Sequence, residues 1–298
     1  MSNPILAFSA RRRMRSVRTP ILVAIYSLLL AVMVWVSAAG LLGDTITLSN
    51  MRAGVDAYVL MLGLQFLLTV LVTPAMTAGA ISGERERQTL DLLLTTNTNA
   101  AQIALGKLLE SFFFVALMIL STLPMLFVVL MTGGITVTQI LIDVLFMLVM
   151  SFAALSIGLF CSALFKRTIT ATVVSYLAVF AIGVGTLLVA AFAMRGYGYE
   201  DVSGQLTRME ALQKLPKIAL LNPGLAFLCL MADHTSLMES TFSMLPSGYM
   251  IFALLKSAGC SLIAWINMVS MTVIAVALTL VSATLVRARG KRPGRKGA

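Results

Sequence analysis

Residues 138–165 read TQILIDVLFMLVMSFAALSIGLFCSALF, and Asp143 is the one charged residue in this stretch. About 20 consecutive apolar residues in a helix are long enough to cross the hydrocarbon layer of a bilayer. A helix also satisfies its backbone N–H and C=O groups internally, as the absence of water in that layer requires. The stretch therefore predicts a membrane-spanning helix.

The same pattern recurs along the chain. Five further apolar stretches have the required length, and they are residues 20–43, 55–81, 105–131, 169–194 and 261–286. The chain is 59% hydrophobic and only 11% charged, whereas soluble domains are about 25% charged. These proportions exclude an ordinary soluble domain. They predict an all-α membrane protein with six transmembrane helices in one domain, residues 20–286.

Basic residues decide the predicted orientation and the predicted partner surface. Most of the 22 Lys and Arg residues lie in the two tails, or in the connections that six crossings put on the side of the termini. Cytoplasmic segments carry such an excess, so we expect both termini in the cytoplasm and residues 195–260 outside. An extra crossing within 195–260 is the alternative, and it would move one terminus outside. The net charge of +10 predicts contact with anionic lipid headgroups and no nucleic-acid binding.

The segments outside the predicted spans have their own patterns. Residues 4–18 mix apolar side chains with five arginines, which predicts an amphipathic interfacial helix within an elbow of residues 1–19; a disordered basic tail is the alternative. Residues 287–298 form a basic tail rich in glycine. In the external segment, prolines separate the apolar stretches 205–221, 223–232 and 249–258, which predict short external or re-entrant helices.

Few side chains have the chemistry of a catalytic or metal site. His234 is the only histidine, and the three cysteines form no CxxC pair, although a zinc site needs about four ligands, or three and a water molecule. Cys229 and Cys260 both fall in the external segment. They could form a disulfide or remain as two buried thiols, and the sequence allows both interpretations. No charged residue lies in the middle of a predicted span, which disfavours an ion-coupled secondary transporter and an intramembrane enzyme. Asp143 is expected near the outer end of its span, in contact with water, with a functional role as the alternative.

A charged connection, residues 82–97, follows the second predicted span and reads SGERERQTLDLLLTTN. On a helix Leu90, Leu93 and Leu94 share one face, while Glu84 and Glu86 fall in the first turn, where the helix dipole favours anions. The pattern predicts an amphipathic helix on the cytoplasmic surface. This pattern alone allows two interpretations of residues 82–97, a solvated connector and a docking element.

Residues 84–96 (ERERQTLDLLLTT) and 103–109 (IALGKLL) resemble the signature of ABC-2 type permeases, the membrane subunits of ATP-binding-cassette exporters. The family pattern is E-x-E-x-G-T-L-E, then L-L-(T/S)-x-P, then G-K and a hydrophobic residue. Gln88 stands where the family commonly has glycine, and Asn97 where it commonly has proline. The six-span layout and the arginine-rich stretch before Pro20 also resemble this family, so the likeness covers nearly the whole chain.

The resemblance implies that residues 82–97 form a coupling helix that contacts a separate ABC ATPase subunit. The residues implied in this contact are Glu84, Arg85, Glu86, Arg87, Gln88, Thr89, Leu90 and Asp91. It also implies a second permease subunit, identical or related, and a bacterial plasma or inner membrane. The chain has no G-x-x-x-x-G-K-[ST] loop to cradle phosphates. We therefore expect it to be no enzyme and to bind no cofactor, with ATP bound by the partner subunit.

These expectations give a permease that forms a translocation pathway and exports a hydrophobic or amphipathic substrate. The alternatives are an ion-coupled secondary transporter, or an ABC membrane subunit that serves lipid extraction or mechanotransmission instead of export. Lys107 and Glu110, near the cytoplasmic end of the third predicted span, are candidates for a gate. The other interpretation is structural, as an i,i+3 pair or with Lys107 extended toward the headgroups.

Overall fold

The computed structural model describes residues 18–39, 48–88, 100–131, 135–193, 215–232 and 259–290, with the single positions 210, 213, 254 and 256. Every regular element in these ranges is helical. The elements are α2 (Arg18–Ala39), α3 (Leu48–Ala78), α4 (Ser82–Glu86), α6 (Ala100–Leu120), α7 (Leu123–Met131), α8 (Val137–Leu164), α9 (Thr168–Phe180), the π-helical turn η1 (Ala181–Gly185), α10 (Thr186–Ala193), the 3₁₀ helix η3 (Lys217–Leu221), α13 (Pro223–Ala232) and α16 (Cys260–Gly290). The predicted elbow helix at 4–18 and the predicted stretch 249–258 lie outside the described ranges, apart from Arg18 and two single positions.

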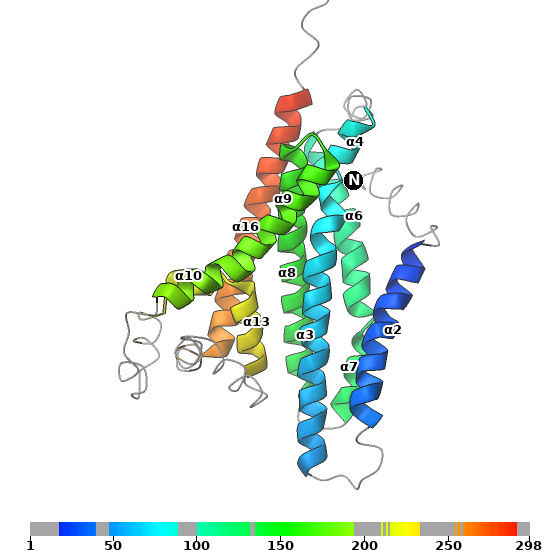
Figure 1. Cartoon of the computed structure of the whole chain (residues 1–298), viewed down its shortest axis with the longest axis vertical. Helices are drawn as coiled ribbons and strands as arrows, with labels where there is room; N and C mark the ends of the chain where they lie inside the picture. The colour runs from blue at the N-terminus through cyan, green and yellow to red at the C-terminus, as the bar shows by residue number, and fades with distance from the viewer. Residues whose placement is uncertain are drawn as a thin grey trace, which may run out of the picture.

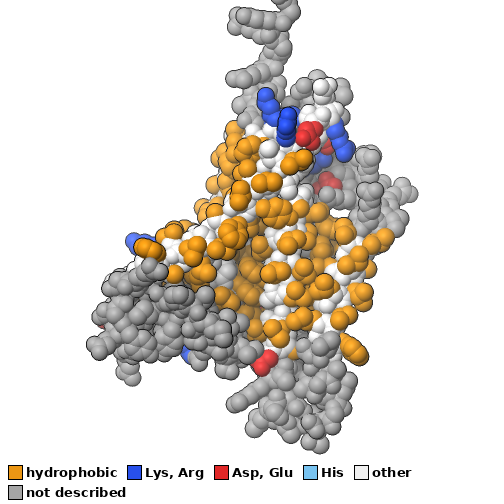
Figure 2. Space-filling view, in the orientation of Figure 1, with side chains coloured by type: hydrophobic (Ala, Val, Ile, Leu, Met, Phe, Trp, Pro, Cys, Tyr) orange, Lys and Arg blue, Asp and Glu red, His pale blue; other side chains and the backbone are white. Residues whose placement is uncertain are grey.

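Five helical stretches of the described chain are long and apolar enough to cross a membrane, and they are Gly54–Glu86, Ala101–Val128, Val137–Leu164, Thr168–Ala193 and Cys260–Val286. The first predicted span corresponds to α2, whose apolar part, Ile21–Met33, is shorter. The prediction of an all-helical, multi-span membrane protein is confirmed, while the count of six crossings stays a prediction. On the face shown in Figure 2, hydrophobic side chains cover most of the described helices, and charged side chains gather at the end where α4 lies.

Helix α8 is the centre of the bundle, with α3, α16, α6 and α9 packed around it (Figure 1). It begins with a capping box, because the Thr136 side chain accepts a hydrogen bond from the Gln139 N–H, and the Gln139 side chain accepts one from the Thr136 N–H. Most of its side chains from Ile140 to Ala163 are buried. The start of α2 and the end of α16 both lie toward the end of the bundle that carries α4 (Figure 1).

Helices α3 and α8 lie in close contact at Gly158. A Cβ atom at this position would clash with the Thr77 hydroxyl and would lie 3.0 Å from the carbonyl oxygen of Pro74. The Thr77 hydroxyl in turn donates a hydrogen bond of 2.8 Å to the carbonyl oxygen of Leu155. Backbone contact and a polar cross-link therefore fix α3 on α8 one turn before the α4 segment begins.

Asp143 is buried, which corrects the expectation that it contacts water. Its side chain is 3% exposed and accepts a hydrogen bond from the hydroxyl of Tyr58, which is fully buried. Position along the sequence places Asp143 near the end of a span, but the packing of α3 against α8 covers it. A buried carboxyl group needs a hydrogen-bond partner, and Tyr58 supplies one.

Two predicted spans are not continuous α-helices. The third, predicted over 105–131, is divided into α6 and α7 at Thr122, whose hydroxyl donates to the carbonyl oxygen of Ile119 at 2.7 Å. Such a side-chain bond competes with the helical ladder. The fifth, predicted over 169–194, contains η1 and bends away from the bundle (Figure 1). Only 11% of its most apolar window is buried, so most of its surface is not covered by the rest of the described chain.

Asn222 holds the bend between α9 and α10. Its amide nitrogen donates to the carbonyl oxygen of Gly183 at 2.6 Å and to the Thr186 hydroxyl at 2.8 Å. Its amide oxygen accepts a hydrogen bond of 2.9 Å from the N–H of Leu225, at the start of α13. One buried side chain therefore caps α13 and satisfies a carbonyl in η1. Helix α13 spans Pro223–Ala232, within the external segment where the sequence predicted a short helix.

Candidate functional site

The α4 segment, Ser82–Glu86, follows a tight turn after α3, and its first turn is capped by another helix. The hydroxyl of Ser162 in α8 accepts hydrogen bonds of 2.9 Å from the N–H groups of both Ile81 and Ser82. The first N–H groups of a helix have no partner within it, and the residue before α4 provides no side-chain cap. Ser162 supplies this cap and so holds the beginning of α4 on the central helix.

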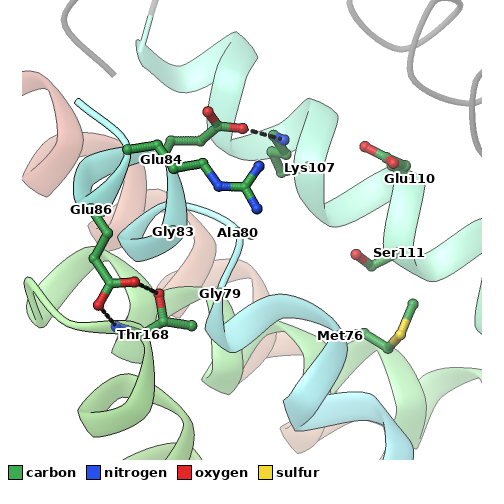
Figure 3. A pocket seen from close by; sticks show the side chains of 11 residues that line it. Met76, Gly79, Ala80, Gly83, Glu84, Glu86, Lys107, Glu110, Ser111 and Thr168 are labelled. Carbon is green, nitrogen blue, oxygen red and sulfur yellow. Dashed lines mark hydrogen bonds and ion pairs between the residues drawn. The ribbon is translucent and has the colours of Figure 1, made fainter. Parts of the chain in front are cut away.

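Glu84 connects α4 to α6. Its carboxylate forms an ion pair with the ammonium group of Lys107 at 3.0 Å, and each side chain is 27% exposed. Figure 3 shows the two side chains pointing toward each other from α4 and α6. Lys107 therefore makes an ion pair between helices, a contact that the i,i+3 interpretation with Glu110 did not include.

Arg85 connects α4 to the end of α8. Its guanidinium group donates hydrogen bonds to the carbonyl oxygens of Phe165, at 3.0 Å, and Ala163, at 3.4 Å. The last carbonyl groups of a helix have no partner within it, and the helix dipole favours a cation there. Arg85 therefore acts as a side-chain cap for the C-terminal end of α8.

Glu86 connects α4 to the beginning of α9. Its carboxylate accepts two hydrogen bonds from Thr168, one of 2.9 Å from the N–H and one of 2.7 Å from the hydroxyl. Figure 3 shows this pair of contacts. Arg167 occupies the N-cap position of α9 and makes no side-chain cap. A carboxylate is favourable at a helix N-terminus, so Glu86 performs the capping role from outside the helix.

The three consecutive side chains Glu84, Arg85 and Glu86 thus attach α4 to three different helices. Sequence analysis selected these residues, but it did not identify Ser162, Thr168 or the carbonyl groups at the end of α8 as their partners. Each partner outside α6 lies about 80 residues further along the chain, and no local pattern marks it.

A cavity of about 410 Å³ lies between the α3–α4 turn, α6 and the start of α9 (Figure 3). The two predicted gate residues, Lys107 and Glu110, line it together with residues of the predicted coupling segment. The full lining is Met76, Gly79, Ala80, Gly83, Glu84, Glu86, Arg87, Lys107, Glu110, Ser111 and Thr168. The structure therefore brings the two predicted groups of site residues to one place. Carboxylates and cations in one open cavity suit contact with a polar segment of a partner protein.

The predicted coupling segment continues past α4. Helix α4 ends at Glu86, short of the end predicted at residue 97, and Arg87 and Gln88 after it are exposed. Gln88 has a φ of 57°, in the left-handed region that favours glycine. Its N–H donates a hydrogen bond of 3.1 Å to the carbonyl oxygen of Arg85. This hydrogen bond is typical of a helix that ends with a residue in the left-handed conformation. Thr89, Leu90 and Asp91 lie outside the described residues.

Gln88→Gly is expected to stabilise the fold by about 1 kcal/mol, because a non-glycine residue in this conformation costs about 1–2 kcal/mol. The family pattern has a glycine at this position, and glycine adopts a positive φ without this cost. Thermal unfolding of the chain in lipid nanodiscs measures the effect. The control is Arg87→Gly, one residue earlier, where φ is −82° and glycine is expected to lower the unfolding temperature. A Gln88→Gly protein that unfolds at a lower temperature than wild type contradicts the prediction.

The described residues contain no cluster of three or more His, Cys, Asp or Glu side chains that could hold a metal ion. Cys161, Cys229 and Cys260 are all buried thiols, and no disulfide joins Cys229 to Cys260. The charged cavity beside α4 is therefore the site on which a functional interpretation of the described chain rests.

The comparison with protein families agrees with this architecture. Residues 4–289 match the model of a family described as ABC-2 family transporter protein. No curated protein matches the sequence at a significant level. The family match spans nearly all of the chain, including every described helix except the last residue of α16. The chain therefore belongs to the ABC-2 family of transporter proteins.

Proposed function

We propose that this chain is the permease subunit of an ABC exporter, and that α4 transmits the movement of a separate ATPase subunit to the transmembrane helices. The observation that carries the proposal is the attachment of α4 to α6, α8 and α9 through Glu84, Arg85 and Glu86. Members of the ABC-2 family are in general membrane subunits without enzymatic activity of their own, which is consistent with ATP hydrolysis on a partner.

The contacts of α4 have the properties that a transmitting element needs. Hydrogen bonds with a charged partner are shorter and stronger than neutral ones, and all three side chains are charged. A displacement of α4 therefore moves the ends of three helices together, as a rigid body, instead of being lost in side-chain rearrangement. In this proposal Arg87, Gln88 and residues 89–97 contact the ATPase. Glu84 and Arg85, which are partly buried, and Glu86, which is exposed but bonded to Thr168, transmit the movement.

The substrate and the assembly follow from the same proposal. A pathway formed by apolar helices suits a hydrophobic or amphipathic substrate, and a second permease subunit, identical or related, completes it. ATP binds to the ATPase subunit, and this chain holds no cofactor. The termini and α4 lie on the cytoplasmic side, where the ATPase docks.

Two variants separate docking from transmission. Arg87→Glu reverses an exposed charge and is expected to abolish co-purification of the ATPase in mild detergent. Arg85→Ala removes an inward contact, so we expect the ATPase to remain bound. In this variant the nucleotide-dependent change in distance between spin labels at Leu105 in α6 and Ile169 in α9, both exposed, is expected to disappear. Electron paramagnetic resonance in nanodiscs measures this distance.

The matched control is Lys217→Glu, which reverses an exposed charge at the start of η3 and is expected to leave both measurements unchanged. If no ATPase associates with the wild-type chain in extracts of its native host, the proposal is wrong. If Arg85→Ala keeps the full nucleotide-dependent distance change, α4 does not transmit through its contact with α8.

A further inference from the structure

A second cavity, of about 110 Å³, lies beneath the π-helical turn η1, between α3, α8, α13 and α16. Its walls include Phe66 of α3, Ala153 and Ala154 of α8, Gly183 of η1 and Met271 of α16. None of its lining residues has a polar side chain. It differs in this respect from the charged cavity beside α4, and the transmission of movement through α4 does not use it.

Water is a poor occupant for this cavity. A buried water molecule needs about two to four polar partners, and apolar cavities of about 150 Å³ stay dry and bind small hydrocarbons such as benzene. Ala153 and Ala154 lie in the middle of α8, which spans Val137–Leu164, so the cavity is at the depth of the bilayer centre. The medium at that depth is the ends of lipid acyl chains.

The wall formed by η1 leaves free space in the cavity, and a hydrogen bond holds this wall in position. A Cβ atom at Gly183 would meet no atom within 4 Å, so space is free beside this residue. Asn222, which is 2% exposed, holds the Gly183 carbonyl through a hydrogen bond and keeps the bend in place. Only 11% of the apolar window of this span is buried by the chain, so in a membrane most of its surface is available to lipid. The cavity is therefore preformed and adjoins a lipid-facing helix.

We propose that this cavity binds the end of one acyl chain of a bilayer phospholipid, while the rest of the lipid stays in its leaflet beside α9. Three observations select this occupant: an entirely apolar lining, a volume suited to a few carbon atoms, and a depth at which hydrocarbon is the solvent. The proposal requires only that the chain spans a membrane. Its failure leaves the coupling proposal untouched, and the failure of the coupling proposal leaves this one standing.

Photo-crosslinking tests the proposal on the full-length chain in phosphatidylcholine vesicles. The probe is phosphatidylcholine with a diazirine near the end of one acyl chain, and mass spectrometry locates the labelled residues. Ala153 and Met271 are 5% and 4% exposed, so lipid that only surrounds the bundle labels them poorly. The expected result is labelling at these buried residues. The same lipid with its diazirine beside the glycerol is expected to leave them unlabelled.

Gly183→Leu fills the cavity from the η1 side and is expected to abolish labelling at Ala153 and Met271. The matched control, Val173→Leu, alters an exposed residue of α9 and is expected to leave the labelling unchanged. Should Gly183→Leu not fold, as judged by thermal unfolding, Ala154→Leu fills the cavity from the opposite wall. Labelling confined to exposed residues of the wild-type chain overturns the proposal, as does buried labelling that persists in a folded, filled variant.

Discussion

Gly158→Ala is expected to destabilise the folded chain by about 1–3 kcal/mol, the usual cost of forcing extra atoms into a packed interior. The added Cβ atom meets the Thr77 hydroxyl and the carbonyl oxygen of Pro74, the latter at 3.0 Å. A backbone carbonyl cannot turn aside as a side chain can, so α3 and α8 have to separate. The displacement also weakens the hydrogen bond from Thr77 to Leu155. Titration of the protein in mixed micelles with sodium dodecyl sulfate measures the free energy of unfolding.

The same chain offers a control with the opposite sign. Gly63 lies within α3, and a Cβ atom there would meet nothing within 4 Å. Since glycine is about 1 kcal/mol less favourable than alanine in a helix, Gly63→Ala is expected to have no cost or to stabilise the fold.

Thr77→Ala in the Gly158→Ala background removes one of the two clashing atoms. The double variant is expected to recover part of the stability lost in Gly158→Ala, as a coupled pair should. If Gly158→Ala is as stable as wild type, α3 and α8 do not meet as closely as the structure shows.

This contact also bears on the proposed function, because it lies one turn of α8 from the cap of α4. Ser162, one helical turn after Gly158, accepts the N–H groups of Ile81 and Ser82. A separation of α3 from α8 at Gly158 therefore displaces the beginning of α4 as well. We expect Gly158→Ala protein that still folds to lose the nucleotide-dependent distance change between α6 and α9.

The apolar helices could be predicted from sequence because their signal is local. Length and hydropathy alone identify stretches such as 138–165, and α8 spans Val137–Leu164. The interruptions of the third and fifth predicted spans could not be predicted in the same way. Threonine side chains are common in membrane helices, so Thr122 alone gives no signal in the sequence. Only its contacts with Ile119 and Gln65 show that it marks the break between α6 and α7. The bend at η1 likewise depends on Asn222, far along the chain.

The sequence predicted which charged residues make up the site at α4, but it did not predict the groups that they contact. Helix-dipole reasoning placed Glu84 and Glu86 favourably in the first turn of their own helix. In the structure Glu86 instead caps α9, and Arg85 caps α8. Both effects depend on the same electrostatics, but the helix termini that the charges stabilise belong to other elements. A sequence pattern shows that charges are concentrated, whereas only the fold shows which helix ends they satisfy.

Tyr58→Phe is expected to lower the free energy of unfolding by about 1–3 kcal/mol, the cost of leaving a buried polar group without its partner. Asp143 is 3% exposed and accepts the hydrogen bond of Tyr58, so the variant leaves a carboxyl group in an apolar interior. Replacing both partners with apolar groups removes that cost. The double variant Tyr58→Phe, Asp143→Leu is therefore expected to be more stable than Tyr58→Phe alone. The same detergent titration measures all three proteins.

Tyr176→Phe is the matched control for this pair. The Tyr176 hydroxyl donates to the carbonyl oxygen of Leu71 at 2.6 Å. This carbonyl lies within α3, where the helical ladder serves the carbonyl groups, so the loss of the Tyr176 hydroxyl is expected to cost less than the loss of the Tyr58 hydroxyl. A Tyr58→Phe protein as stable as Tyr176→Phe would show that Asp143 finds another partner or reaches water. The expectation of a solvated carboxylate, which position along the sequence favoured, would then be restored. If the double variant is more stable than the wild-type chain, the Tyr58–Asp143 pair contributes less to stability than apolar packing would. A role other than stability then has to explain a carboxyl group between α3 and α8.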